Sequence, residues 1–127
     1  MNTQEMYETC ALHLLKQNEK SVPADSAFGN TCLYRGPNGL MCGVGILIKD
    51  AFYGEALEGQ GVVDDMVINA VELSIGRELT GIEQELLNDI QYCHDDYFPE
   101  SWKSELVWIG EKYDLDTTKV REYDNSN

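Results

Sequence analysis

Cysteine and histidine are the residues of this 127-residue chain whose types are suited to metal or thiol chemistry. Cys32 and Cys42 flank a glycine-rich turn, and Cys93 and His94 form a second pair of soft ligands. Zinc accepts thiolates and imidazole in tetrahedral sites. In such sites, however, about two to four residues typically separate the paired cysteine ligands. Cys32 and Cys42 are further apart than that, so small thiols filling a tight core are the ordinary interpretation. A metal-binding module using Cys32, Cys42, Cys93 and His94 is kept as an alternative, and no cofactor is expected.

The same residues could also form a nucleophilic pair. Cys32 or Cys42 would attack, His13 or His94 would be the base, and Asp95 would orient the ring. Activation of a thiol requires an electropositive environment that lowers its pKa, and this chain is strongly acidic. No family signature for a catalytic cysteine surrounds either residue. The sequence therefore favours a protein that is not an enzyme.

Three close pairs of carboxylates could serve acid–base chemistry or hold Mg²⁺. In a chain with 23 acidic residues such pairs arise by chance, so a solvated surface is the ordinary interpretation. The pairs are Asp64 with Asp65, Glu83 with Glu85, and Asp95 with Asp96.

The glycines at 36–39 and 43–45 could be taken for a phosphate cradle. Neither a Lys-Ser/Thr pair nor the G-x-G-x-x-G spacing accompanies them, so turn formation and close packing explain them better. Arg35 is the base near these glycines, and an ordinary salt bridge or carbonyl contact is expected for it. A protein that sequesters a small nucleotide signal near Arg35 is a further alternative.

Helical patterns surround this segment on both sides. Asn2 and Glu5 have the spacing of a capping box, which predicts a first helix to about Glu19. A loop is expected from 20 to 30. A second helix is predicted from about 63 to Gly76, and a third after the capping box of Thr80 and Glu83. Apolar residues at Ile82, Leu86, Ile90 and Cys93 form the stripe expected to face the core of the third helix.

Pro99 suits the first turn of a last long helix. Its core stripe is Trp102, Leu106, Ile109 and Tyr113, which leaves Trp108 well off the core face. Either this helix is buried on two sides, or Trp108 belongs to a surface that binds a partner or a second copy. Asp116 is expected to cap a short final turn.

Two short apolar runs, 31–35 and 40–42, flank the turn Gly36-Pro37-Asn38-Gly39. Proline presets one turn dihedral and Asn-Gly accepts positive φ, so this pattern predicts a β-hairpin. The run 43–48 is too short for its periodicity to distinguish a strand from a helix. The expected fold is α+β and mainly α, with four to five helices and one short β-hairpin inserted after the first helix.

The segment predicted to form the hairpin also matches a known sequence motif. Residues 32–45 read CLYRGPNGLMCGVG, which resembles the C-x-Y-R-G-x-x-G-x-x-C motif of small phage and prophage proteins. The likeness extends to Leu57–Gly59 and more loosely to Gln91–Asp95. Gly43 stands where that group tends to have alanine. These proteins have no settled biochemical role, so the resemblance implies a phage setting and no mechanism.

The charge of the chain is unevenly distributed. It carries 9 Lys and Arg against 23 Asp and Glu, a formal net charge of −14. Residues 1–49 are neutral overall, so the whole excess lies in 50–127. A field of this sign repels nucleic acids, anionic membranes and small polyanions, and attracts basic protein surfaces.

Length and composition indicate one domain spanning 1–127. It comprises a neutral hairpin-containing part at about 1–49, an acidic helical part at about 50–124 and a frayed tail at 125–127. The sequence contains no long apolar run and no signal-peptide pattern at the start. We therefore expect a location in the host cytoplasm with four reduced cysteines.

The leading hypothesis is a phage-encoded, non-enzymatic interaction protein. It would bind and inhibit a host defence or nucleic-acid-processing protein through an acidic helical face, with nucleic-acid mimicry as one form of this. A homodimer through the last helix is a further expectation, and direct binding to nucleic acid or membrane is not expected. The candidate partner-binding residues are Asp64, Asp65, Glu72, Glu83, Glu85, Asp89, Asp95, Asp96 and Trp108.

Overall fold

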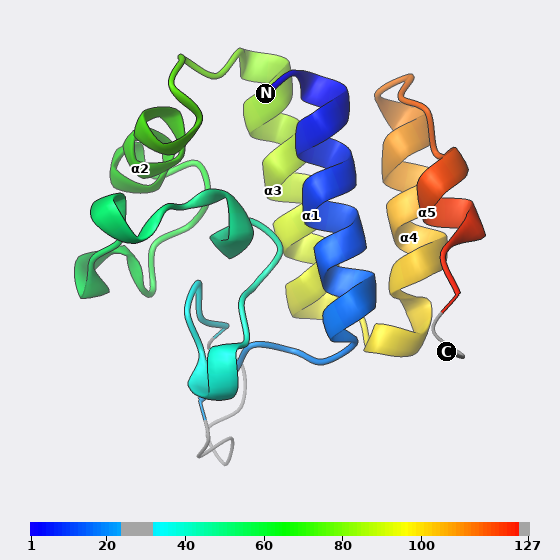
Figure 1. Ribbon diagram of the computed structural model, residues 1–127, viewed down its shortest axis with the longest axis horizontal. Helices are drawn as coiled ribbons and strands as arrows, with labels where there is room; N and C mark the ends of the chain where they lie inside the picture. The colour runs from blue at the N-terminus through cyan, green and yellow to red at the C-terminus, as the bar shows by residue number, and fades with distance from the viewer. Residues whose placement is uncertain (24–31, 125–127) are drawn as a thin grey trace.

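Three amphipathic helices lie side by side at the centre of the computed structural model (Figure 1). They are α1 (Thr3–Gln17), α3 (Gly81–Asp96) and α4 (Pro99–Lys112). Helices α1 and α3 run in the same direction and α4 runs in the opposite one (Figure 1). The structure describes residues 1–23 and 32–124, so the expected frayed tail and most of the expected loop lie outside the described residues.

Two further helices flank these three. The short helix α5 (Thr118–Glu122) packs against α1 and α4, and α2 (Asp65–Ile75) lies on the far side of α1 from α4 (Figure 1). Buried hydrophobic residues from Met6 to Val120 form one core cluster. Among the described residues, no helix combines the length and the apolar character that crossing a bilayer requires.

Local capping signals determine where the helices begin. Asn2 and Glu5 form the predicted capping box, in which the Asn2 side chain accepts from the Glu5 backbone N–H at 2.8 Å. Thr80 and Glu83 form a second one at the start of α3. The prediction of Pro99 in the first turn of α4 is also confirmed. Each cap satisfies N–H groups that the first helical turn leaves without a partner.

The core stripes predicted for α3 and α4 are buried except at Ile82 of α3, which is exposed, and Tyr113 after α4, which is half-buried. Trp102, Leu106 and Ile109 of α4 are buried, as predicted. In α3, however, Ile82 is 63% exposed, so its assignment to the core stripe is wrong. At about 100° per residue, Ile82 lies a quarter turn from the centre of the buried side, and Glu83 takes that central position instead.

The predicted β-hairpin is absent, and the described residues contain helices and turns without strands. The turn itself forms as a 3₁₀ turn, η2 (Pro37–Gly39), in which Asn38 adopts the left-handed conformation at φ 59°. Across it, the Gly36 N–H donates to the Leu40 carbonyl at 2.7 Å. The fold class is therefore all-α in the described residues, and the α+β prediction is corrected.

The physical reason lies in where the flanking backbone groups find partners. The N–H groups of Tyr34 and Arg35 donate to the Glu58 carboxylate at 2.8 and 3.1 Å. The Met41 N–H donates to the Gln17 side chain of α1 at 2.9 Å. Side chains from distant segments thus satisfy donors that a hairpin would have paired across its ladder.

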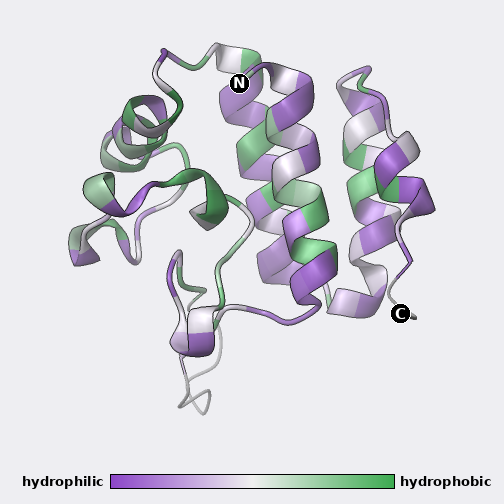
Figure 2. Cartoon of the chain, in the orientation of Figure 1, coloured by the Kyte–Doolittle hydropathy of each residue, from purple (hydrophilic) through white to green (hydrophobic). Residues whose placement is uncertain are grey.

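The segment 43–48, whose periodicity does not distinguish a strand from a helix, contains a 3₁₀ turn, η3 (Gly45–Leu47). It packs between α1 and α2 and is hydrophobic along much of its length (Figure 2). Two more 3₁₀ turns follow, η4 (Asp50–Phe52) and η5 (Glu55–Leu57). Together these turns connect α1 to α2.

Candidate functional site

A groove of about 290 Å³ lies between α3 and α4 and combines aromatic rings with charged groups. Such a combination suits recognition of a cationic group, because ring faces and carboxylates both attract positive charge. The groove is lined by Asp89, Tyr92, Cys93, Tyr97, Glu105, Trp108, Ile109 and Lys112.

Helix α3 contributes its outer face to this site. Glu85, Asp89, Tyr92 and Asp96 recur at intervals of three, four and seven residues, so they line one side of the helix. Glu85, Tyr92 and Asp96 are exposed, and Asp89 is half-buried beside the groove. Three of the predicted partner-binding carboxylates therefore share a stripe with an exposed tyrosine.

Helix α4 contributes Glu105, Trp108 and Lys112 at positions i, i+3 and i+7. Trp108 is 59% exposed, whereas Trp102 of the same helix is fully buried. The described part of the chain therefore does not bury α4 on a second side at Trp108. A large indole exposed beside a groove is the kind of feature that marks a contact surface.

Asp89 holds the two helices together at one end of the groove. Its Oδ2 accepts hydrogen bonds from Lys112 Nζ at 2.8 Å and from the Tyr113 hydroxyl at 2.6 Å. Burial, and then the bond to Asp89, raises the pKa of Tyr113 to about 12. The Lys112 ammonium also lies 5.8 Å from the centre of the Trp108 ring. Asp89 therefore already has a cation beside it.

Glu105 occupies the groove without such a partner. Its carboxylate forms no hydrogen bond or ion pair with the described residues, and its charge is the largest cause of the raised pKa of Tyr97. The rings of Tyr92 and Tyr97 meet edge to face beside it, 6.3 Å apart and at 73° to one another. The groove thus presents aromatic walls and one carboxylate that no described residue neutralises.

Most of the other predicted carboxylates serve the fold. Asp64 caps α2 by accepting from the Met66 N–H at 2.9 Å, and Glu72 accepts from the Leu79 N–H at 2.7 Å. Glu83 is buried in an ion pair with Arg77. Asp65 is exposed on α2, on the far side of α1 from α4 (Figure 1). The nine candidates therefore do not form one face.

Cys32, His94 and Asp95 form a compact cluster, with ligand atoms within 4.8 Å of one another. His94 is fully buried, and its Nδ1 lies 2.8 Å from Asp95 Oδ1. Its Nε2 accepts from the Ser21 backbone N–H at 3.0 Å. Because Nε2 is an acceptor, the ring proton resides on Nδ1 and is donated to Asp95.

This arrangement does not suit a metal ion or a nucleophile. Both nitrogens of His94 are already used, and Cys42 and Cys93 lie outside the cluster. Burial, and then a hydrogen bond to Asp95, raises the pKa of Cys32 to about 12, so its sulfur is a protonated donor. Burial would raise the pKa of Asp95, but the bonds from His94 and Cys32 outweigh it and lower that pKa.

The other histidine and the arginine also have structural partners. His13, the second candidate base, lies 3.1 Å from the Met41 carbonyl oxygen through Nε2. Arg35 forms an ion pair with Asp50, donates to the Ile48 carbonyl at 2.8 Å and stacks over the Tyr53 ring. These bonds correspond to the salt bridge and carbonyl contact expected for Arg35. They engage both terminal nitrogens of the guanidinium group, whereas its Nε is buried without a hydrogen-bond partner among the described residues.

The three stretches that carry the phage-protein resemblance meet around one cavity of about 340 Å³. Its lining includes Cys32 and Tyr34 from the first stretch, Gly59 from the second, and Gln91 and Asp95 from the third. Gln91 accepts from the Val44 N–H at 3.3 Å and donates to Asp95 at 2.8 Å. These residues hold the irregular segment 32–45 against α3.

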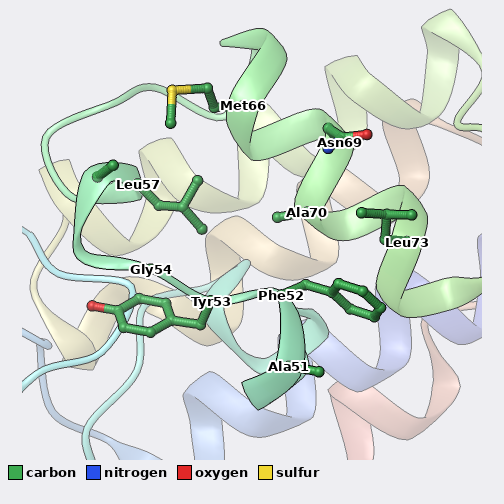
Figure 3. A pocket seen from close by; sticks show the side chains of 10 residues that line it. Ala51, Phe52, Tyr53, Gly54, Leu57, Met66, Asn69, Ala70 and Leu73 are labelled. Atoms are coloured by element: carbon green, nitrogen blue, oxygen red, sulfur yellow. The ribbon is translucent and has the colours of Figure 1, made fainter.

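A third groove, between α2 and the 3₁₀ turns η4 and η5, is lined without charged residues. In Figure 3, Phe52 extends toward Leu73 of α2, and Leu57 points toward Ala70. Phe52, Met66 and Leu73 are partly exposed around it. With no carboxylate in its lining, this groove is less suited to a basic surface than the one between α3 and α4.

Comparison of the chain with protein-family models, curated protein sequences and solved structures found no match. The partner-binding candidates chosen from the sequence include Asp89 and Trp108 of this groove and omit Tyr92, Tyr97, Glu105 and Lys112. The polar stripes of the two predicted helices were the available signal, because Tyr92 continues the spacing of Glu85 and Asp89.

Proposed function

We propose that this protein is a non-enzymatic acidic interaction protein that binds a basic surface of another protein through the outer face of α3 and α4. The observation that carries the proposal is the exposed indole of Trp108 beside a groove that also contains Asp89 and Glu105. The exposed carboxylates of Glu85 and Asp96 extend this face along α3. Binding would cover the basic surface and thereby inhibit the partner.

Charge and aromatic area contribute differently to such an interface. A net charge of −14 steers a basic partner toward the protein and raises the association rate at low salt. Exposed carboxylates at the rim add little affinity once salt screens them. Aromatic anchors at the centre of an interface contribute most of the binding free energy. We therefore expect Trp108 to contribute more to affinity than any single carboxylate.

The setting of the proposal comes from the phage-protein resemblance, which suggests that the partner is a host defence or nucleic-acid-processing protein in the host cytoplasm. A face that imitates nucleic acid would need many free carboxylates. Five of the eight predicted ones accept hydrogen bonds within the chain, namely Asp64, Glu72, Glu83, Asp89 and Asp95. Recognition of a basic groove-filling segment is therefore the form of binding that we favour.

Affinity capture from host lysate with paired variants tests this function. The site variant combines Glu85→Gln, Asp96→Asn and Trp108→Ala, and the matched control combines Glu55→Gln, Asp65→Asn and Leu73→Ala on the α2 side. A true partner is retained by the wild type and the control at low salt, lost by the site variant, and weakened at high salt. A partner that the site variant retains would contradict the proposal.

Self-association is a separate outcome of the same surface. A homodimer through α4 would bring Glu105 and the acidic stripe of α3 close to their copies, which like-charge repulsion opposes. Sedimentation of the wild type and the Trp108→Ala variant at low and high salt distinguishes the two cases. Dimerisation that requires Trp108 would reassign this face to a second copy of the chain.

A further inference from the structure

We propose that the groove between α3 and α4 is a socket for the guanidinium group of an arginine side chain, with Trp108, Tyr92 and Tyr97 as its walls and Glu105 as its counter-ion. This inference rests on the proposed function, because it specifies the chemical group that the basic partner inserts. The groove has a volume of about 290 Å³, and the ligand class inferred for it is a guanidinium group.

The groove already attracts one cation from the chain itself. Lys112 Nζ lies 5.8 Å from the centre of the Trp108 ring and 5.2 Å from that of Tyr113, within the range of cation–π contact. The same ammonium bonds to Asp89 at 2.8 Å, so this carboxylate is neutralised. The Lys112 end of the groove therefore has its charge balanced internally.

Glu105 is the carboxylate that remains without a partner among the described residues of the groove. Its charge acts on Tyr97 and on Cys93, which places it beside the tyrosine wall and the thiol of the lining. An incoming cation therefore meets an unneutralised carboxylate and the ring of Tyr97 together. This pairing distinguishes the groove from an acidic surface patch, where no ring would contact the ligand.

The shape of the walls favours a guanidinium group over an ammonium group. A guanidinium group is planar, weakly hydrated and able to stack on one ring while donating to a carboxylate. The near-perpendicular rings of Tyr92 and Tyr97 offer one face and one edge to such a plane. An ammonium ion is compact and strongly hydrated, so it gains less from a ring face at an exposed site.

A titration followed by ¹H–¹⁵N NMR at low ionic strength tests the inference on the full chain. The probes are N-acetyl-arginine amide, N-acetyl-lysine amide and the neutral isostere N-acetyl-citrulline amide. The arginine probe is expected to shift the indole N–H signal of exposed Trp108 and leave that of buried Trp102 in place. Citrulline is expected to shift neither, and lysine is expected to bind about two- to fivefold more weakly than arginine.

Two variants with the same change in net charge distinguish binding in the groove from attraction by the overall negative charge of the protein. Glu105→Gln is expected to weaken arginine binding about two- to fivefold. Glu111→Gln, on the same helix but outside the groove, is expected to leave binding unchanged. The folded state of both variants is checked by the dispersion of the same spectra.

Three results would overturn the socket: an equal response to citrulline, lysine binding as tight as arginine binding, or equal effects of the two variants. Failure of this test leaves the proposed function standing, because a captured partner could still bind the acidic face without inserting arginine. Success of the test together with failure of the capture experiment would instead leave a guanidinium site without a protein partner.

Discussion

Arg77 and Glu83 form a two-pronged ion pair in which both nitrogens of the guanidinium fork donate to the carboxylate, at 2.9 and 2.7 Å. The Glu83 side chain also accepts from the Thr3 hydroxyl at 2.7 Å and from the Thr80 N–H at 3.0 Å. It therefore joins the start of α1, the turn after α2 and the start of α3. A residue that the sequence presents as one acid among many is a structural junction.

Replacement of Glu83 by Gln should destabilise the fold. The amide retains the shape but loses the charge that Arg77 requires, and it cannot accept all the bonds that the carboxylate accepts. Solvent screens part of the attraction, because the Arg77 side chain is partly exposed. We therefore expect the free energy of unfolding to fall by about 2 kcal/mol. Urea unfolding at pH 7 measures it. Glu85→Gln, at an exposed position two residues away, is the control and should change stability by less than about 0.5 kcal/mol.

The contribution of Glu83 should also depend on pH. Its bond from Arg77 is the main cause that lowers the pKa of Glu83 from 4.5 to about 2. The stabilisation is therefore complete above about pH 4.5 and is lost as the pH falls toward 2. The difference in stability between the wild type and Glu83→Gln should shrink across this interval. A difference that stays constant from pH 7 to pH 2 would contradict the ion pair.

His94 should be a neutral ring with its proton on Nδ1. The acceptor role of Nε2 toward the Ser21 N–H and the short contact between Nδ1 and Asp95 both require this tautomer. Long-range ¹H–¹⁵N correlation spectra at pH 7.5 distinguish the two tautomers directly. Observation of a proton on Nε2 would show that the Ser21 contact is not a hydrogen bond.

The loss of the His94 ring should be costly for stability. The ring is fully buried and stacks on Trp102 with 5.5 Å between ring centres, so His94→Ala leaves a cavity and an unpaired Ser21 N–H. We expect a loss of about 3 kcal/mol in thermal or urea unfolding. His13→Ala, which removes a half-buried ring, should cost less than half of that.

The cysteines should react slowly as long as the protein is folded. Burial is the main cause that raises the pKa of Cys32, Cys42 and Cys93 to about 12, so few thiolates exist at pH 8. Mass spectrometry after iodoacetamide treatment should show slow alkylation in buffer and fast alkylation in urea. Asp95→Asn should speed the reaction of Cys32 selectively, because it removes the carboxylate to which this thiol donates. Fast labelling of wild-type Cys32 would reopen the nucleophile hypothesis.

The metal alternative has its own test. Since both nitrogens of His94 are engaged, we expect the purified protein to contain no stoichiometric zinc and to keep its melting temperature in EDTA. Elemental analysis and a thermal scan with and without chelator suffice. One zinc ion per chain, lost together with thermal stability, would restore the alternative.

Gly45 should tolerate no side chain. A Cβ at this position would overlap the Tyr34 carbonyl oxygen, which is backbone and cannot rotate away. We expect Gly45→Ala to lower the free energy of unfolding by about 2 kcal/mol or more. Gly54→Ala is the matched control, because nothing lies within 4 Å of its Cβ position and its φ of −151° suits alanine. Equal stability of the two variants would contradict the close approach at Gly45.

The starts of the helices could be predicted from the sequence, because capping is local. Asn2 with Glu5 and Thr80 with Glu83 are three residues apart, so their hydrogen bonds depend on few other contacts. The buried face of α4 could be predicted for the same reason, since residues three and four apart share one side of a helix. The same periodicity placed Trp108 off the core face and left open whether a second side of the helix buries it, and in the structure this side chain is exposed.

The hairpin prediction failed because strand pairing is not local. The residues Pro37–Gly39 predicted a turn, and this turn forms. Its flanking N–H groups, however, found better partners in Glu58 and Gln17, which lie far away in the sequence. Local patterns predict that backbone donors need partners and do not identify which ones they take.

The main helices, two of their caps, most of the buried faces and the net charge of −14 could all be predicted from the chain's residues alone. The tertiary structure decided which of the acids are free to act. Glu83 became a buried junction and Asp95 a partner of His94, whereas Glu105, beside Tyr97 and Trp108, pairs with no residue that the structure describes. The physical reason is that a carboxylate is neutralised by whichever donor the packing brings to it, and packing joins residues that the chain keeps apart.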